Sequence, residues 1–293
     1  MARYQKIRVI GSGGFGEVWE ARQDGTGRQV AVKLLTELDT DSRKRFFREA
    51  RLLEACKVCP QIVEIVEHLP RNRPPAIVME YCQHGSLEEA IGKNGPYPWE
   101  ISLWITGQMA RALDFVHQCG GFHRDVKPGN MLIKSLDPKR WVVKLSDFGL
   151  GQAPDATSGM TNTACGTRAY MAPELFRGAE YTASCDIYSL GISFIQMITT
   201  SADRDLSVSI FFEPEVQILL NEMIDPIAAK RPTAAEVVRR IDEILAEVRQ
   251  RHQKLPEKKK QAAMAEIGGA LVAGLAIAGL VGLIAALFGG KKK

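Results

Sequence analysis

The sequence His123-Arg124-Asp125-Val126-Lys127-Pro128-Gly129-Asn130 decides how this chain is interpreted. Asp125 offers a carboxylate that can accept a proton from a hydroxyl, and Lys127 offers a cation that can steady a transferring phosphoryl group. Asn130 adds an amide oxygen, which is a hard ligand suited to Mg²⁺. Polar residues around a Pro-Gly pair also form ordinary surface turns, so the octet must be read together with the segments around it.

Composition limits the class of protein. A chain of 293 residues can build two lobes with a real core. The net charge of +4 is small, and much of the excess lies in two Lys clusters near the C-terminus, so we expect no nucleic-acid partner. The six cysteines are scattered and no secretory signal is visible, which indicates reduced thiols in a cytosolic compartment.

The N-terminal segment contains a glycine-rich turn between strands. Alternating apolar residues predict strands at 7–10, 17–22 and 29–34. Glycines between the first two strands would let backbone N–H groups approach a triphosphate. A strand follows this turn, whereas a dinucleotide-binding fold would have a helix there. From this motif alone, a glycine-rich hairpin that binds no ligand remains an alternative interpretation.

A lysine and a glutamate follow in positions where they could pair. Lys33 ends the apolar strand Val30-Ala31-Val32-Lys33, and a strand-end lysine needs an anion to hold it inward. The next segment, 41–55, has the apolar spacing of a helix and carries Glu49. Glu49 is therefore the candidate partner of Lys33.

Together with Asp147-Phe148-Gly149, these segments resemble the eukaryotic-type (Hanks-type) serine/threonine protein kinases. The glycine loop, strand lysine, helix glutamate, catalytic octet and Asp-Phe-Gly occur in the order and approximate spacing of that family. The resemblance covers about residues 4–248. It implies an α+β bilobal kinase fold, with a β-rich N-lobe at 1–82 and a helical C-lobe at 83–251.

The resemblance also implies an ATP site between the lobes. Lys33 would hold the α- and β-phosphates and pair with Glu49. Met79 would be the gatekeeper, and the backbones of Glu80 and Cys82 would bind adenine. The full set implied for nucleotide binding is Gly11, Ser12, Gly13, Gly14, Phe15, Gly16, Val18, Ala31, Lys33, Met79, Glu80, Cys82 and Leu132.

For catalysis the resemblance implies that Asp125 orients and deprotonates the attacking hydroxyl, and that Asn130 and Asp147 hold Mg²⁺, with Mn²⁺ as an alternative. Lys127, together with Thr167, resembles the pattern of Ser/Thr-specific members. The substrates would be proteins with Ser or Thr acceptors. The competing interpretation is a membrane-tethered nucleotide-binding pseudokinase or scaffold. The presence of Lys33, Asp125, Asn130 and Asp147 favours the enzyme.

Several other residues have structural roles implied by the resemblance. Glu174 would pair with Arg231, and Asp186 would anchor the backbone of the catalytic loop. His123, Phe148 and Leu53 would belong to a stacked hydrophobic spine. A cationic Arg124 next to the catalytic Asp predicts a phosphate on the following loop, which would result from autophosphorylation. The candidates are Thr157, Ser158, Thr161 and Thr163, with Thr161 or Thr163 favoured.

Two segments toward the end of the chain differ from the usual pattern of the kinase family. The segment 201–214 is shorter than the corresponding segment of the family, which often helps to dock substrates, so the resemblance does not predict the protein partners of this chain. Residues 267–288 contain no charged or strongly polar residue and would span roughly 33 Å as a helix, which matches a bilayer core. We therefore expect a basic juxtamembrane linker at 252–266, a transmembrane helix at 267–288 in the lipid bilayer, a short basic tail at 289–293, and a cytoplasmic kinase domain.

Small residues recur at every fourth position of the apolar segment. Such a ridge lets two helices approach closely, so we expect a homodimer through this helix, although a Gly/Ala-rich span shows some of this pattern by chance. The residues are Ala270, Gly274, Ala278, Gly282 and Ala286.

Overall fold

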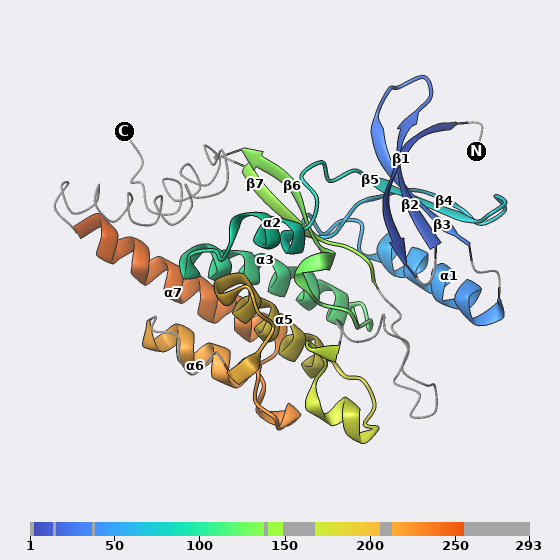
Figure 1. Ribbon diagram of the computed structural model, residues 1–293. Coiled ribbons are helices and arrows are strands. Elements are labelled where there is room, and N and C mark those ends of the chain that lie inside the picture. The colour runs from blue at the N-terminus through green and yellow to red at the C-terminus, as the bar shows by residue number, and fades with distance from the viewer. Residues whose placement is uncertain are drawn as a thin grey trace.

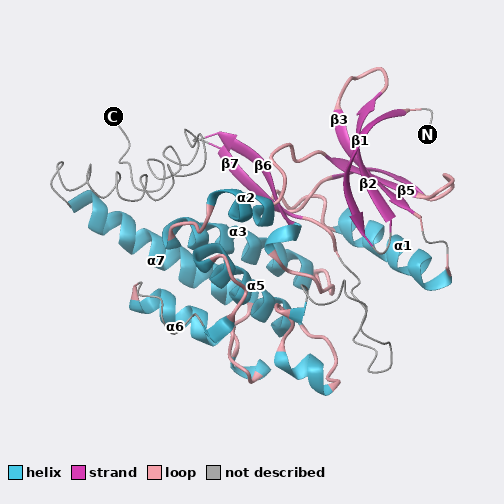
Figure 2. Cartoon of the chain, in the orientation of Figure 1, coloured by secondary structure: helices cyan, strands magenta, loops and turns pink. Residues whose placement is uncertain are grey.

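The chain forms a smaller lobe built on a β-sheet and a larger helical lobe, joined by the segment that follows β5 (Figure 1). The computed structural model describes residues 3–13, 16–36, 39–137, 140–148, 168–205 and 213–254. The sheet of the smaller lobe has five strands, and among the described residues of the helical lobe the strands β6 and β7 form a hairpin. Figure 2 shows the strands of the sheet gathered at the N-terminal end of the molecule. The predicted bilobal architecture is therefore confirmed.

The N-lobe sheet has the strand order β1-β2-β3-β5-β4, and all of its neighbouring strands are antiparallel. Helix α1 packs below this sheet, on the side of the helical lobe (Figure 1). The elements are β1 (Tyr4–Gly13), β2 (Gly16–Gln23), β3 (Gln29–Leu35), α1 (Thr40–Ala55), β4 (Ile65–Leu69) and β5 (Ala76–Glu80).

Alternation along β3 determines where its lysine lies. Val30, Val32 and Leu34 are buried in a cluster on one face of the sheet. Leu35 instead belongs to the main core, which it shares with Leu53 of α1. Because successive side chains of a strand point to opposite faces, Lys33 shares its face with Leu35 and is directed toward α1.

Helices α3, α5 and α7 form the centre of the C-lobe, and α3 contacts both of the others. Helix α5 is buried almost all round, as expected for a helix at the centre of a lobe. The hydroxyls of Ser189 and Ser193 donate to the carbonyls of Cys185 and Ser189, which satisfies polar groups inside this helix. The helices are α2 (Leu87–Asn94), α3 (Trp99–Gln118), α5 (Ala183–Thr199), α6 (Pro214–Met223) and α7 (Ala234–Lys254).

Short elements place the catalytic segment between the lobes. The 3₁₀ turn η1 (Pro128–Asn130) leads into the hairpin of β6 (Met131–Asp137) and β7 (Arg140–Leu145). A bridge joins Ile62, ahead of β4, to Leu145 at the end of β7, and the Val63 N–H donates to the Leu145 carbonyl at 3.0 Å. Asp147 therefore follows directly after β7, whose last residue is hydrogen-bonded to the segment before β4. Two further 3₁₀ turns are η2 (Pro173–Arg177) and η4 (Ala228–Lys230).

Most predicted elements are present, with differences in detail. The helix predicted at 41–55 is observed as α1, which begins one residue earlier at Thr40. Ser86 caps α2 by accepting from the Glu89 N–H at 3.2 Å. Strand β4 was not predicted, and β1 begins at Tyr4 instead of residue 7. No helix in the described part of the chain has the length and apolarity to cross a bilayer. The predicted span at 267–288 and both flanking segments beyond residue 254 lie outside the described residues.

Candidate active site

Three charged side chains from three elements meet between the lobes. Lys33 Nζ, from β3, lies 2.7 and 2.9 Å from the two carboxylate oxygens of Glu49 on α1. The same ammonium lies 2.5 Å from Asp147 Oδ1, just after β7. The predicted partner of Lys33 is therefore in place, and Asp147 joins the pair from the C-lobe.

Burial disfavours the charged forms of these three side chains, and the attraction between the ammonium and the carboxylates opposes this effect. Burial lowers the pKa of Lys33, but the carboxylates of Asp147 and Glu49 more than compensate, so the net pKa is raised. The Lys33 ammonium holds the pKa of Asp147 below its ordinary value. Burial raises the pKa of Glu49 against the attraction of Lys33. Lys33 and Asp147 are thus held in their charged forms.

The catalytic octet brings three polar side chains to one point. Asn130 Nδ2 donates to the backbone carbonyl of Asp125 at 2.7 Å and to Asp125 Oδ2 at 2.9 Å. Lys127 Nζ lies 2.8 Å from the same Oδ2. Asp125 Oδ1 is buried and has no hydrogen-bond partner among the described residues. One oxygen of Asp125 is therefore fixed by two donors, and the other is left to accept a proton.

The donors available to a metal ion fit Mg²⁺. Asn130 uses its amide nitrogen on Asp125, which turns its amide oxygen away from that carboxylate. The side chain of Asp147 is 46% exposed, so its carboxylate can reach a bound ligand. An amide and a carboxylate oxygen are the hard donors that Mg²⁺ prefers.

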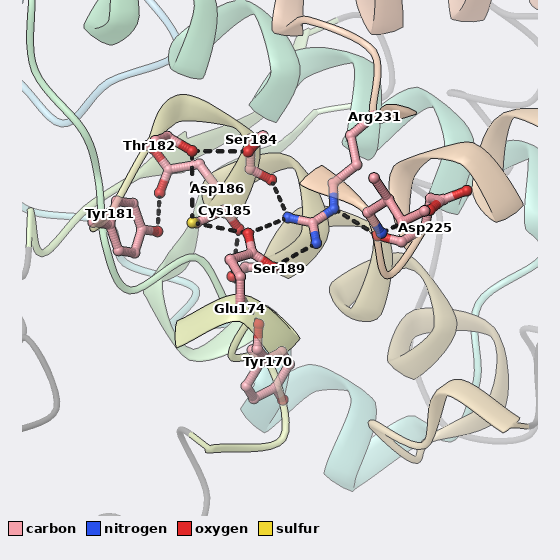
Figure 3. Close-up of polar contacts among 11 residues, drawn as sticks. Tyr170, Glu174, Tyr181, Thr182, Ser184, Cys185, Asp186, Ser189, Asp225 and Arg231 are labelled. Atoms are coloured by element: carbon pink, nitrogen blue, oxygen red, sulfur yellow. Dashed lines mark hydrogen bonds and ion pairs between the residues drawn. The ribbon is translucent and has the colours of Figure 1, made fainter. Parts of the chain in front are cut away.

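Asp186 holds the backbone of the catalytic loop, as predicted. This fully buried carboxylate accepts the N–H of His123 and the N–H of Arg124, each at 2.9 Å. It also accepts from Tyr181 Oη at 2.6 Å, and His117 Nε2 lies 2.9 Å away (Figure 3 shows the contact with Tyr181). Burial would raise the pKa of Asp186, but these hydrogen bonds lower it overall. The contributions of His117 and Tyr181 were not predicted.

The fixed loop carries backbone strain. Arg124 has φ of 70° and Asp147 has φ of 52°, a left-handed conformation that residues with a Cβ rarely adopt. Such a conformation costs about 1–3 kcal/mol per residue and persists only where the surroundings impose it. At Arg124 the backbone N–H is held by Asp186 at 2.9 Å, and at Asp147 the carboxylate is held by Lys33 at 2.5 Å.

The predicted pair of Glu174 and Arg231 forms a two-bond contact across the C-lobe (Figure 3). Both guanidinium nitrogens lie 2.7 Å from the carboxylate oxygens, and Arg231 also donates to the carbonyls of Asp225 and Ser184. Burial raises the pKa of Glu174, but its hydrogen bond to Arg231 outweighs this effect. The pair anchors η2 to the segment before α7.

His123 has a structural environment. It is fully buried, its ring centroid lies 4.9 Å from that of Phe148, and its Nε2 lies 2.9 Å from the Ser146 carbonyl. Burial lowers the pKa of His123, so the neutral form is favoured. Phe148 and Leu53 are buried in the same core, which agrees with the predicted spine.

The segment between the lobes is fixed by ion pairs that sequence reasoning missed. Glu80 accepts from Lys144 at 2.5 Å and lies 3.4 Å from Lys134, which also donates to the Tyr81 carbonyl at 2.6 Å. A second carboxylate contact goes to the Glu64 N–H at 2.9 Å. In the sequence, the only sign of these contacts was a lysine on each strand of the hairpin, Lys134 and Lys144. The Glu80 side chain therefore faces the hairpin, which leaves only its backbone for the predicted contact with adenine.

The remaining nucleotide-binding candidates that the structure describes lie on the strands next to Lys33, on the segments that follow them and on β6. Val18 pairs with Lys33 across the sheet, Ala31 pairs with Met79, and Leu132 bridges to Ser86. Gly11, Ser12 and Gly13 end β1, Gly16 begins β2, and Cys82 is buried just beyond β5. Gly14, Phe15, Thr167 and the candidate phosphorylation sites at 157, 158, 161 and 163 lie outside the described residues.

A family model described as "Protein kinase domain" matches residues 4–241. The chain belongs to the protein kinase family. Its kinase domain is 37% identical over 203 residues to the serine/threonine-protein kinase PknK of Mycobacterium tuberculosis (strain H37Rv), covering 69% of this chain and 18% of that protein. It is 31% identical over 243 residues to the probable serine/threonine-protein kinase zyg-1 of Caenorhabditis elegans, covering 81% of this chain and 33% of that protein.

A plant relative is similar over a comparable stretch. The kinase domain is 30% identical over 256 residues to CBL-interacting serine/threonine-protein kinase 2 of Arabidopsis thaliana, covering 80% of this chain and 55% of that protein. The chain thus spans from about a fifth to about half of the length of these relatives. The shared part is the kinase domain, and it supports ATP-dependent phosphorylation of Ser and Thr.

Proposed function

We propose that this chain is an ATP-dependent serine/threonine protein kinase that transfers the γ-phosphate of ATP to Ser or Thr hydroxyls of proteins. The observation that carries the proposal is the meeting of Lys33, Glu49 and Asp147 beside the Asp125–Asn130 contact, in a chain of the protein kinase family. A pseudokinase would not require every one of these groups.

In the proposed reaction Asp125 acts on the acceptor hydroxyl. Its free Oδ1 accepts the proton while the hydroxyl oxygen forms a bond to the γ-phosphorus. The bond from that phosphorus to the bridging oxygen breaks, and its electron pair leaves with ADP. Lys127, held at 2.8 Å from Asp125, lies where it can neutralise charge on the transferring group.

Lys33 holds the phosphates of ATP in this proposal, and Glu49 keeps the lysine extended toward them. Asn130 and Asp147 would bind Mg²⁺, or Mn²⁺ in its place, which supplies positive charge to the phosphates. The glycine-rich turn would cover the triphosphate from above. Val18, Ala31 and Leu132 would enclose adenine, with Met79 behind it and the backbones of Glu80 and Cys82 as its hydrogen-bonding partners.

The test uses the full chain with Mg²⁺, γ-labelled ATP and a generic protein substrate, followed by phosphoamino-acid analysis and mapping of modified sites. We expect label on Ser and Thr of the substrate, and on Thr161 or Thr163 of the chain itself. Label found mainly on Tyr would contradict the Ser/Thr assignment implied by Lys127 and Thr167. ATP binding without any transfer would favour the scaffold interpretation.

We also propose that residues 267–288 anchor the kinase domain in a membrane, with the linker at 252–266 on the cytoplasmic side. The support is the sequence, because 22 residues without a charge match the thickness of a bilayer core. Carbonate extraction of membranes from expressing cells tests this: the full chain should stay in the pellet, and a chain ending at residue 254 should be released. Release of both would contradict the anchor.

The small-residue ridge supports a homodimer of the anchored form, which would place two kinase domains together for phosphorylation in trans. Replacing Gly274 and Gly282 by Ile should weaken crosslinking of the full chain in membranes. Replacing Leu271 and Leu275 by Ile, which leaves the small-residue ridge unchanged, is the matched control. Unchanged crosslinking in the glycine variant would contradict the dimer.

A further inference from the structure

Three cysteines from two distant segments of the sequence gather where the end of α1 meets the end of α3. Cys56 directly follows the last residue of α1, and Cys59 lies one turn further along, with its N–H donating to the Cys56 carbonyl at 3.0 Å. Cys119 is the C-cap residue of α3. The thiols of all three are free in the structure. These cysteines therefore lie on both sides of the boundary between the lobes.

The end of α1 packs closely on the end of α3. A Cβ placed on Gly121 would lie 2.8 Å from Leu52 Cδ1, so the backbone just after α3 touches the last turns of α1. The Leu52 carbonyl accepts the N–H of Cys56 at 2.9 Å, which fixes Cys56 to the same turn. Further along, Gln61 Nε2 donates to Gln108 Oε1 of α3 at 3.2 Å. These contacts hold the segment after α1 in place against α3.

Cys56 is the cysteine whose thiol neighbours that of Cys119. Burial raises the pKa of the Cys56 thiol to about 12, and the Cys119 thiol adds more to this increase than Cys59 does. Burial also raises the pKa of Cys59, but there the contribution of Cys119 is minor. The Cys59 thiol instead donates to Gln61 Oε1 at 3.5 Å. The sulfur contact between the two lobes is therefore made by Cys56 and Cys119.

The two thiols of this pair differ in their access to solvent. Cys56 is fully buried, whereas Cys119 is exposed at the surface. A reagent dissolved in water therefore reaches Cys119 first and finds Cys56 next to it. An accessible cysteine beside a second, resolving cysteine is the arrangement that forms reversible disulfides. Where thiols are otherwise kept reduced, such pairs respond to oxidants.

We propose that Cys56 and Cys119 are a modification site at which hydrogen peroxide forms a disulfide that joins the end of α1 to the end of α3. The Cys119 thiolate attacks one oxygen of the peroxide, the O–O bond breaks, and hydroxide leaves, which gives a sulfenic acid. The Cys56 sulfur then attacks the sulfur of that sulfenic acid, so an S–S bond forms and the S–O bond breaks with loss of a second hydroxide. The two thiol protons convert the two hydroxide ions to water. Two electrons pass from the sulfurs to the peroxide, and a dithiol reverses the reaction.

The disulfide would fix α1 in the position that the structure shows. Glu49 lies about two turns before Cys56 on the same side of α1, and its carboxylate holds Lys33 in the same structure in which the two thiols are neighbours. The crosslink is therefore compatible with the Lys33–Glu49 pair. It also closes the loop of residues 56–119, which restricts the unfolded chain and raises Tm by roughly 5–10 °C.

The test treats the full chain with hydrogen peroxide, blocks the remaining thiols with N-ethylmaleimide under denaturing conditions, and maps tryptic peptides by mass spectrometry. Lys57 lies between Cys56 and Cys59, so trypsin places each of the three cysteines on a peptide of its own. We expect the Cys56 and Cys119 peptides to be joined with the loss of two hydrogen atoms, and dithiothreitol to separate them. A link from Cys119 to Cys59 would overturn the proposal, as would Cys56 and Cys119 thiols that are still blocked by maleimide after the treatment.

Two variants connect the crosslink to stability. Cys119→Ser changes an exposed position, so it should fold like the wild type but lose both the crosslink and the rise in Tm. Cys59→Ser is the matched control, because its hydroxyl can still donate to Gln61, and it should keep both. A rise in Tm that survives in Cys119→Ser would overturn the proposal. Loss of the crosslink in Cys59→Ser would overturn the pairing, and a crosslinked wild type with an unchanged Tm would overturn the effect on the fold.

The crosslink and Tm measurements require no phosphoryl transfer, so this proposal and the kinase assignment fail independently. A third measurement compares peptide phosphorylation by the wild type and Cys119→Ser after the same peroxide treatment. The crosslinked wild type should keep kcat within about twofold of the treated variant, because the disulfide preserves the contact between Lys33 and Glu49. A kcat that falls in step with crosslink formation, in the wild type alone, would show that the disulfide displaces α1 and would overturn this part of the proposal.

Discussion

Replacing Asp186 by Asn should loosen the catalytic loop by a predictable amount. The wild-type carboxylate accepts two backbone N–H groups, one on each oxygen, from His123 and Arg124. An asparagine has only one acceptor oxygen, because its amide nitrogen can only donate. Whichever way the amide turns, one of the two buried N–H groups is left without an acceptor.

An unsatisfied buried N–H costs about 1–3 kcal/mol, and the remaining bond also loses its charge-assisted strength. We therefore expect a loss of about 3 kcal/mol in the free energy of unfolding. For a domain of this size that corresponds to a fall in Tm of roughly 6–12 °C. Because the strained φ of Arg124 is no longer imposed, kcat should fall together with stability.

Thermal unfolding and initial rates of peptide phosphorylation, measured on the same samples, test this reasoning. Tyr181→Phe is the matched control, since it removes one donor to Asp186 and leaves both backbone bonds in place. It should cost only about 1 kcal/mol. An Asp186→Asn variant with the wild-type Tm and kcat would refute the assignment of Asp186 as the residue that fixes the loop.

Three further changes test other contacts. Lys33→Met should abolish phosphate transfer while leaving the protein folded, as judged by circular dichroism and Tm, because it removes the cation that we propose holds the phosphates of ATP and that Glu49 positions. The pKa of Glu174 is lowered from its ordinary value of 4.5, so its pair with Arg231 stabilises the fold above that pH. This stabilisation is lost as the pH falls from 4.5 through the lowered pKa. The Tm difference between wild type and Glu174→Gln should therefore shrink in acid. Gly191→Ala should destabilise α5 by about 1–3 kcal/mol, because its Cβ would lie 2.6 Å from Ile224 Cγ2.

For each of these three variants, a specific result would contradict the prediction. Undiminished label in Lys33→Met would remove the proposed phosphate contact. A Tm difference for Glu174→Gln that is constant between pH 7 and acid would show that the pair does not titrate as described. Gly92→Ala is the control for Gly191→Ala, since nothing lies near its Cβ; it should stabilise α2 by about 0.5–1 kcal/mol, and equal effects at both glycines would contradict the packing argument.

Sequence patterns were sufficient to predict features that depend on a single helix or strand or on two consecutive ones. The helix at 41–55 follows from its apolar spacing, and the Lys33–Glu49 pair follows from the alternation of β3 and the position of Glu49 on that helix. Strand β4 was missed because its residues are only half-buried and include Glu67 and His68, which weakens the apolar alternation.

The contacts that fix the site depend on residues distant in the chain. His117 and Tyr181 meet Asp186 from α3 and from the segment before α5, and Lys144 reaches Glu80 across the lobes. No local pattern encodes such meetings. The contact between Cys56 and Cys119 likewise depends on the packing of α1 against the end of α3, which only the folded chain brings together.

The most direct test of the account measures ATP affinity and phosphate transfer side by side in the wild type and in Asp125→Asn. The account predicts an ATP Kd within about threefold of the wild type, because Asp125 lies at the acceptor side of the site, and a transfer rate lower by at least about a thousandfold, since proton acceptance and alignment are both lost. A variant that transfers phosphate at the wild-type rate would contradict the assignment of Asp125 as the catalytic base, and with it the central claim.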